Sequence, residues 1–470
     1  TTGDVVKQYQ TAEWDQESPY NTLCPKIEGT QTVTGCVATA ISILMRYHQW
    51  PNAGTGTLPA YSYEALVSGA KIHQNVSGRT LGHTYAWNDM PLQYDRNSSE
   101  ISKNEVATLM YDCGVMAQAE FNIASAGGTG AATLTAVRGL AEYMKYDKSM
   151  LCLRREWYSD TEWIQMLENE IMTVGPVLYG GATLSNEGHQ FILDGYTTEN
   201  YFRVNWGWSG HSNGFFLISA LNPDDQGAGG STGGGFIANQ DALFGLKPAK
   251  GNSNYQTLLG MLAGKTGSGE SYSGLMTSET QFNVNTNFTV KCGFFWNLGL
   301  IPFSGKVALA IVDKNQNVRE LISGTSSIPS MNTYGGMAFT FPCKISLSPQ
   351  PGDRIVAVYK GTNDADWKIV RGGPDTTNEI IVKTDPTPII ETEQETRFTV
   401  HCDKQQGTVI AHLPENSHTL NVYDVNGCLL RQILSEGKDT IIFSCREYPA
   451  GVYILQVITD KGSQQCKFLK

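Results

Sequence analysis

The stretch Thr34-Gly35-Cys36-Val37-Ala38-Thr39-Ala40 decides the fold of the first half of this chain, because it places one thiol at the start of an apolar-periodic segment. The i, i+3, i+4, i+7 spacing of a helix with one buried face is met by Val37, Ala40, Ile41, Leu44 and Tyr47. Trp50-Pro51 stops the pattern, since the residue before a proline disfavours helix. The pattern therefore predicts a helix that begins at Cys36.

Cys36 has two interpretations at this position. A helix N-terminus offers unpaired N–H groups and about half a positive charge, which favour a thiolate. With a protonated histidine nearby as well, the pKa of a cysteine falls from about 8.5 to roughly 3–4. The alternative is a small buried hydrophobe on a core helix, because free cysteine is among the most buried residue types.

A second segment favours the nucleophile. Residues 187–196 and 201–208 are predicted to be two strands joined by a Thr-Thr-Glu-Asn turn, with His189 in the first and Asn205 in the second. In the order Cys, His, Asn, the imidazole would take the thiol proton and an Asn205 amide oxygen would fix its tautomer. Trp206 and Trp208 would shield that bond from water. Taken in isolation, His189 would be interpreted as a core histidine with its hydrogen bonds made, and Asn205 as an amide that caps a turn. Together with Cys36, these two interpretations become the weaker ones.

These segments resemble the streptopain-type, papain-like cysteine peptidases. The matching residues are Tyr20-Asn21, Cys24-Pro25, 34–40, Tyr47-His48, Gly188-His189, 205–208, 221–223 and 244–248. The resemblance covers roughly the first half of the chain. It implies a two-lobed α+β papain-like domain without a cofactor, with Cys36 as nucleophile, His189 as general base, and Asn205 and Trp206 as candidates for orienting the imidazole.

The resemblance also implies an oxyanion hole, made from the backbone N–H of the nucleophile and a Gln side chain six residues upstream. Here Gln31 lies five residues upstream of Cys36, and Thr30 takes the expected place. We expect the Cys36 N–H and Gln31 to hold the oxyanion. Loss of one such donor typically costs about 10²–10³ in rate.

Two further sites follow from the resemblance as expected substrate contacts. Gly188 lies in Glu-Gly-His-Gln (187–190), where the family more often has Gly-Gly-His-Ala, and this difference at the cleft is expected to affect specificity. Ser125 lies in a Gly-rich segment, 125–132, whose backbone would border the non-primed subsites. The alternative for this segment is a loop that only precedes a helix over 134–145.

The Gly-rich stretch 227–235 has no Gly-Lys-Ser/Thr ending and no following helix, so it is not a phosphate loop. Its glycines predict a mobile loop, since glycine loses the most backbone entropy on ordering. In relatives the corresponding loop lies beside the cleft, which suggests a lid.

Length and composition fit a secreted enzyme with appended modules. The 470 residues predict two to four domains, and the net charge of −11 argues against nucleic acid as a partner. No run approaches the roughly 18 apolar residues of a membrane span. Because no signal peptide precedes Thr1, we expect a processed form that lacks its targeting and pro segments, as from a zymogen.

If Cys36 stays unpaired as the nucleophile, nine of the ten cysteines remain. An odd number of cysteines cannot all form disulfides within one chain. Neither Cys-x-x-Cys nor His-Glu-x-x-His occurs, so no metal site is expected. Geometry must decide whether Cys292 and Cys343 bridge two sheets, or whether two of the four C-terminal cysteines pair.

The chain changes character after residue 248. Alternating segments over 255–383 predict an immunoglobulin-like β-sandwich behind the 1–248 peptidase domain. A proline-rich, acidic join at 383–395 leads to a second small all-β sandwich over 396–470. Pro449-Ala450-Gly451-Val452-Tyr453 and the terminal Lys-Phe-Leu-Lys resemble the sorting domain of type IX secretion, which implies outer-membrane export machinery as a partner.

The sequence thus predicts a secreted or surface-attached virulence-type cysteine endopeptidase that hydrolyses host or nutrient proteins through an acyl-enzyme. Two alternatives stay open: an adhesin or binding protein built on a protease-like scaffold, and an acyl transferase that uses the same Cys36 and His189.

Overall fold

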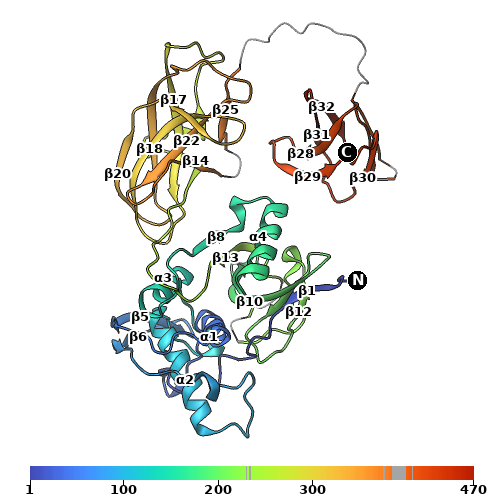
Figure 1. Cartoon of the computed structure of the whole chain (residues 1–470). Coiled ribbons are helices and arrows are strands. Elements are labelled where there is room, and N and C mark those ends of the chain that lie inside the picture. The colour runs from blue at the N-terminus through green and yellow to red at the C-terminus, as the bar shows by residue number, and fades with distance from the viewer. Residues whose placement is uncertain (229, 232–233, 374–375, 384–397, 405) are drawn as a thin grey trace. The chain divides into compact units, whose positions relative to one another are not determined.

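The computed structural model describes residues 1–228, 230–231, 234–373, 376–383, 398–404 and 406–470 (Figure 1). The contacts divide the chain into two compact units, Thr1–Thr384 and Asp385–Lys470. Each unit is described by itself.

The first part of the Thr1–Thr384 unit is mainly helical (Figure 1). Helix α1 (Cys36–His48) begins at the predicted residue and buries Val37 through Met45. Helices α2 (Glu100–Met116) and α3 (Thr133–Tyr143) pack against it. Ser99 caps α2 by accepting from the Ser102 N–H. Short antiparallel pairs surround these helices: β2 (Lys26–Ile27) with β3 (Thr30–Gln31), β4 (Thr57–Leu58) with β7 (Arg79–Thr80), and β5 (Tyr61–Val67) with β6 (Ala70–Val76).

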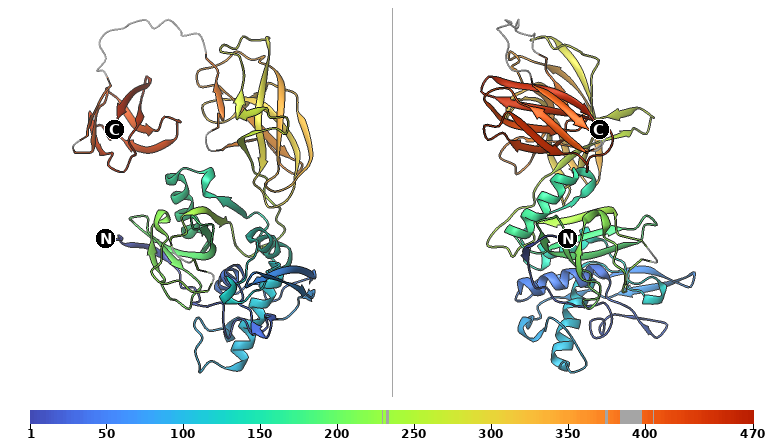
Figure 2. Two further views of the ribbon diagram at one scale, coloured as in Figure 1. Left: turned by 180° about the vertical axis from the view of Figure 1, so that it is seen from behind. Right: turned by 90° about the vertical axis from the view of Figure 1, so that its right-hand side faces the viewer.

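A sheet faces this helical half. Its strand order is β12 (Gly214–Phe216), β11 (Phe202–Asn205), β10 (Gly188–Thr197), β9 (Val177–Ala182), β13 (Ala238–Phe244) and β8 (Leu151–Arg154), with β1 (Val5–Gln8) also paired to β10. Every pairing is antiparallel. Helix α1 contacts β10 and β9 from the helical half, and α4 (Asp160–Thr173) packs on the same two strands. Figure 2 shows α1 and the sheet adjacent in both views. The arrangement brings the start of α1 to the start of β10.

The sheet half has a core of its own, rich in aromatic side chains. Trp163, Tyr179, Phe191, Trp206 and Trp208 lie in it, while α1, α2 and α3 share a separate core. The predicted strands over 187–196 and 201–208 are β10 and β11, although β11 ends at Asn205. The chain therefore leaves the sheet at the residues expected to orient the histidine.

Residues 259–381 form two packed sheets with a common core. One contains β15 (Ser271–Ser273), β14 (Leu259–Lys265), β17 (Asn287–Asn297), β16 (Leu275–Met276), β21 (Gly336–Lys344) and β24 (Arg371–Gly372). The other contains β19 (Val318–Leu321), β18 (Phe303–Val312), β22 (Arg354–Gly361), β23 (Lys368–Ile369), β20 (Ser326–Met331) and β25 (Glu379–Ile381). This matches the predicted all-β character of the segment.

The Asp385–Lys470 unit is also all-β among its described residues. One sheet contains β26 (Thr399–Asp403), β27 (Thr408–His412) and β30 (Thr440–Ser444). The other has the order β29 (Leu429–Leu434), β28 (Ser417–Tyr423), β31 (Val452–Thr459), β32 (Gly462–Leu469). Both sheets contribute to one hydrophobic core.

The division at 384/385 falls in the expected join at 383–395, of which 384–397 lie outside the described residues. The contacts make no division near 248. Contacts cross that position: Arg371 donates to the Trp157 carbonyl and to both Glu162 oxygens, and its guanidinium lies 3.7 Å from the centre of the Tyr158 ring.

No disulfide joins any of nine of the cysteines: Cys24, Cys36, Cys113, Cys152, Cys292, Cys343, Cys402, Cys445 and Cys466. Cys292 and Cys343 lie on neighbouring strands of one sheet, so they do not bridge two sheets; Cys292 is opposite Phe339, and Cys343 is opposite Phe288. In the C-terminal unit, the sulfur atoms of Cys402 and Cys445 lie 4.0 Å apart, in a thiol–thiol hydrogen bond and not in a disulfide. Among the described residues, no helix is long and apolar enough to span a membrane.

Candidate active site

Cys36 is the first residue of α1, and the residue before it fixes how the chain enters the helix. Gly35 has φ 87° and ψ 151°, a backbone conformation that residues with a Cβ rarely adopt. A Cβ at this position would also lie 3.0 Å from the Thr129 carbonyl oxygen. Thr129 holds that approach in place by donating to the Val33 carbonyl at 2.6 Å. The thiol is therefore presented by a turn that only glycine fits.

The Cys36 thiol is half-buried and surrounded by backbone amides. Burial is the largest influence and raises the pKa of Cys36, while the N–H groups of Gln190, Cys36 and Val37 act on the thiol and lower its pKa. The sequence predicted a lowered pKa from the helix N-terminus. The three amides supply that effect, but burial outweighs it.

His189 is buried, and its two ring nitrogens have different surroundings. Nε2 lies 2.9 Å from the Trp206 carbonyl oxygen. Because a carbonyl only accepts, Nε2 carries the proton and the neutral ring leaves Nδ1 as the basic nitrogen. Nδ1 has no hydrogen-bond partner among the described residues. Gln190, the next residue along β10, places its N–H at the Cys36 thiol, so Nδ1 is free on the strand that touches the nucleophile.

Aromatic rings enclose the imidazole. Trp208 stacks on it with ring centres 4.7 Å apart, and Phe236 and Phe191 lie at 5.4 and 5.9 Å. Trp206 stacks at 6.3 Å, so Trp208 is the nearer of the two tryptophans. Burial lowers the pKa of His189 to about 4, and the Trp206 carbonyl opposes this shift. The resting site therefore favours a neutral imidazole beside a neutral thiol.

The sequence predicts that the amide oxygen of Asn205 orients the imidazole, but the structure places that oxygen elsewhere. That oxygen accepts from the Gly207 N–H at 3.1 Å, and the amide nitrogen donates to Thr11 Oγ1 and the Ala12 carbonyl, both at 2.9 Å. Asn205 instead shapes the turn after β11. The turn presents the Trp206 carbonyl, so the backbone of Trp206 is the group that fixes His189.

The side chain of Gln31 also forms its hydrogen bonds away from Cys36. It lies on β3 opposite Lys26, and its amide nitrogen donates to the carbonyls of Asn21 at 3.0 Å and Cys24 at 2.6 Å. These bonds close the loop before β2. The expectation that Gln31 holds the oxyanion is contradicted, because the β-pairing of residue 31 directs its amide into that loop.

Gln16 is an amide that the sequence analysis missed. Its side chain is buried, its Nε2 donates to the Ala228 carbonyl at 2.6 Å, and its Oε1 has no partner in the described part of the chain. The same carbonyl accepts from Trp208 Nε1 at 2.9 Å, and the Gln16 carbonyl accepts from the Thr34 N–H at 3.0 Å. Gln16 thus joins the segment before Cys36 to the ring that covers His189. No local pattern marks it, because it lies twenty residues before Cys36 in the sequence.

The predicted substrate contacts lie at the surface. Gly188 is exposed at the start of β10, and Ser125 is exposed in a short 3-10 helix, Ala124–Ala126, of the loop that Thr129 ties to the segment before Cys36. The predicted lid, 227–235, includes residues 229 and 232–233, which are outside the described residues.

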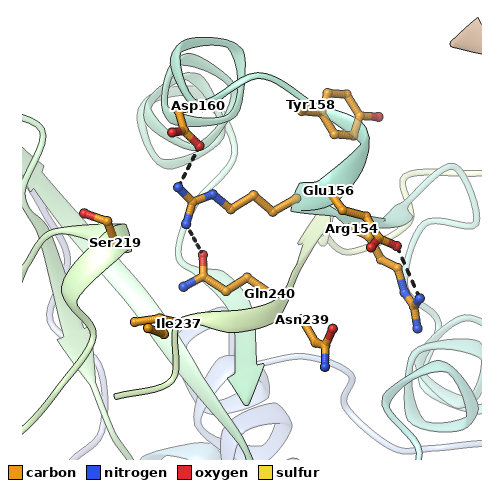
Figure 3. A pocket seen from close by; sticks show the side chains of 9 residues that line it. Arg154, Glu156, Tyr158, Asp160, Ser219, Ile237, Asn239 and Gln240 are labelled. Atoms are coloured by element: carbon orange, nitrogen blue, oxygen red, sulfur yellow. Dashed lines mark hydrogen bonds and ion pairs between the residues drawn. The ribbon is translucent and has the colours of Figure 1, made fainter. Parts of the chain in front are cut away.

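A hollow of about 460 Å³ lies between the start of α4 and the start of β13 (Figure 3). None of the predicted site residues lines it. Arg155 lines it and donates to Gln240 Oε1 at 2.8 Å and to Asp160 Oδ1 at 2.7 Å. Through these two bonds, Arg155 links Asp160 at the start of α4 to Gln240 on the sheet. The hollow is therefore a structural contact, separate from the site at Cys36.

Comparison with known proteins supports a peptidase in this half of the chain. Residues 14–216 match the Peptidase C10 family. The chain is 36% identical over 237 residues to the thiol protease/hemagglutinin PrtT of Porphyromonas gingivalis, and 34% identical over 247 residues to streptopain of Streptococcus pyogenes. It is 32% identical to the solved structure of active interpain A cysteine protease of Prevotella intermedia, with a TM-score of 0.44.

The extent of these similarities differs. The alignments cover 50% of this chain in both curated relatives, but 26% of PrtT and 60% of streptopain. With interpain A they cover 52% of this chain and 94% of that structure. The match to the family model ends at residue 216.

Proposed function

Because the N-terminal half of this chain belongs to the peptidase C10 family and is a papain-like cysteine peptidase domain, we propose that the whole chain is a secreted or cell-surface endopeptidase. One observation carries the mechanism: the Trp206 carbonyl holds the proton of His189 on Nε2 and leaves Nδ1 free.

In this mechanism the Cys36 thiol transfers its proton to His189 Nδ1, and the sulfur attacks the peptide carbonyl carbon. Neither charge is favoured alone, since burial raises the pKa of Cys36 and lowers that of His189, so thiolate and imidazolium form together and stabilise each other. The imidazolium then protonates the leaving amine. Water, deprotonated by the neutral imidazole, releases the acyl group and restores the thiol.

The oxyanion formed in each step requires hydrogen-bond donors. The Cys36 N–H at the start of α1 is one. We assign the second to Gln16 Nε2, because this buried amide has a second N–H beyond the one given to Ala228 and lies on the Trp208 side of the site. Gln31 is excluded from this role by its bonds to Asn21 and Cys24.

The test uses the reduced full-length protein, an unfolded protein substrate and an epoxide inhibitor of thiol proteases. Wild type is expected to cleave the substrate and to carry one label, on Cys36. Cys36→Ala should do neither, whereas Cys24→Ala, which removes a buried thiol of the same domain, should keep both. Cleavage by Cys36→Ala would refute the mechanism. Transfer of the acyl group to an added amine in place of water would identify an acyl transferase, and binding of host surfaces without cleavage would favour an adhesin.

We also propose that the C-terminal unit directs export and surface attachment through a type IX system. Support comes from its sequence pattern and from the hydrophobic core that this unit forms by itself. Removing 396–470 in a host with this system should leave peptidase activity in the cells and abolish it at the surface. Unchanged surface activity would contradict this role.

A further inference from the structure

Three neighbouring strands place Gln190, Gly180 and Asp241 in one row beside Cys36. Gly180 on β9 is paired with Gln190 on β10 and with Asp241 on β13. Residues directly opposite on adjacent strands share a face of the sheet. The row begins at the nucleophile, because the N–H of Gln190 acts on the Cys36 thiol.

The absent side chain of Gly180 lets its two neighbours meet. Gln190 Nε2 donates to Asp241 Oδ1 at 3.3 Å, and Thr133 at the start of α3 donates to Gln190 Oε1 at 3.1 Å. A Cβ at residue 180 would lie 2.4 Å from Gln190 Oε1 and 2.7 Å from Asp241 Oδ1. Two oxygen acceptors therefore converge over Gly180, and any larger residue there would separate them.

The Asp241 carboxylate has no ion-pair partner in the part of the chain that the structure describes, although Arg154 is its opposite neighbour on β8. Arg154 is turned toward Glu156, with Nη1 3.5 Å from its carboxylate (Figure 3), and its guanidinium lies over Tyr334. Burial raises the pKa of Asp241, more than Gln190 and Arg154 lower it. A carboxylate in this setting gains most from a cation that a ligand brings.

The distance suits a side chain of a bound peptide. Adjacent strands lie about 4.8 Å apart, so Asp241 is about 10 Å across the sheet from Gln190. An extended peptide advances about 3.3 Å per residue. A long side chain that starts within about three residues of the cleaved bond therefore reaches the carboxylate.

We propose that Gln190, Gly180 and Asp241 form a substrate subsite that selects a basic side chain, lysine or arginine, close to the cleaved bond. This inference rests on the proposed peptidase function and names part of its substrate class. Asp241 would pair with the cation, and Gln190 Oε1 would accept a further N–H. Thr133 would hold the Gln190 side chain in place.

The first experiment compares kcat/KM for a peptide series in which one residue at a time, within three positions of the cleaved bond, is Arg or Met. Wild type should prefer Arg at one position by about tenfold or more, the scale of a partly buried charge pair. Asp241→Asn keeps the acceptor for Gln190 and should lose that preference while the Met peptides change little. Asp89→Asn, an exposed acid of the same domain, is the matched control. Equal effects of Asp241→Asn on both peptides, or no preference in wild type, would overturn the subsite.

The second experiment separates this inference from the proposed function. Calorimetry measures binding of the same Arg and Met peptides to Cys36→Ala and to Cys36→Ala/Asp241→Asn. Tighter binding of the Arg peptide that vanishes in the double variant supports the subsite, even if wild type cleaves nothing and Cys36 resists the epoxide. Equal binding of both peptides to Cys36→Ala would refute the subsite, even if cleavage is robust.

Discussion

His189 Nε2 and the Trp206 carbonyl oxygen lie 2.9 Å apart, and this bond determines which nitrogen of the histidine is basic. A carbonyl cannot donate, so the proton stays on Nε2, and Nδ1 is the nitrogen that we propose takes the thiol proton. The acceptor belongs to the backbone, so no side-chain change at 206 removes it directly. Its position depends on the turn after β11, which Asn205 holds through the Gly207 N–H.

Asn205→Ala should therefore lower kcat more than it alters KM. The variant removes three described hydrogen bonds of a buried amide and frees the peptide that carries the Trp206 carbonyl. Unfolding in urea should show a loss of about 1–3 kcal/mol. Trp206→Phe is the comparison, because it keeps the carbonyl and loses the Nε1 bond to Ser212, and it should retain more kcat. The reverse ranking would mean that the indole, and not the backbone, orients the histidine.

Two glutamine variants test the oxyanion hole. Gln16→Ala should lower kcat/KM by about 10²–10³, the usual cost of losing one oxyanion donor. Gln31→Ala should lower stability, because its amide closes the loop at Asn21 and Cys24, but leave kcat/KM within a few-fold. Steady-state kinetics on one peptide, with active sites titrated by the epoxide, measures both. A large kinetic loss confined to Gln31→Ala would restore the sequence-based assignment.

The sequence predicts those features whose cause is local. The apolar spacing after Cys36 and the proline at 51 fix both ends of α1, and the apolar segments around His189 and Asn205 give β10 and β11. The resemblance then predicts that Cys36 and His189 share a cleft. Each of these signals lies within a few residues of the feature it predicts.

What the sequence does not predict depends on tertiary contacts or on the backbone. The Trp206 carbonyl is present in every residue type, so no letter marks it as the partner of His189. Gln16 lies beside the segment before Cys36 because its carbonyl accepts from the Thr34 N–H, a contact between residues far apart in the sequence. Gln31 has a suitable side chain near the expected position, but the hairpin with Lys26 directs it away. The raised pKa of Cys36 likewise reflects burial that a helix start alone does not reveal.

Gly35→Ala should destabilise the protein and misplace the thiol. A residue with a Cβ at φ 87° costs about 1–3 kcal/mol, and here its Cβ would meet the Thr129 carbonyl at 3.0 Å as well. Gly69→Ala is the matched control, because Gly69 has φ 82° and nothing within 4 Å of a built Cβ. Urea unfolding and the rate of Cys36 labelling measure the two effects. Gly69→Ala should lower the free energy of unfolding somewhat and leave the rate of Cys36 labelling unchanged. If Gly35→Ala and Gly69→Ala give the same stability and the same labelling rate, the contact with Thr129 is unimportant.

Acid should destabilise the fold through two histidines, the buried His189 and the half-buried His48. Burial lowers the pKa of both His189 and His48 to about 4, from an ordinary value of 6.5. Between these values the unfolded chain binds more protons than the folded one, so stability is present above pH 6.5 and is lost as the pH falls toward 4. From pH 7 to pH 5 each histidine should account for roughly 2 kcal/mol.

His48 offers the cleaner measurement, because it lies at the end of α1, away from the thiol, and its Nε2 is buried without a partner among the described residues. In a Cys36→Ala background, which prevents self-cleavage, His48→Gln should shrink the difference in unfolding free energy between pH 7 and pH 5 by roughly 2 kcal/mol. His73→Gln is the control, since His73 is exposed and pairs with Glu64, which raises its pKa. Because its pKa is raised, His73 stabilises the folded protein more at pH 5 than at pH 7, which is the opposite of His48. His73→Gln should therefore not reduce the loss of unfolding free energy between pH 7 and pH 5. If His48→Gln leaves the pH dependence unchanged, His48 is not held neutral in the folded protein.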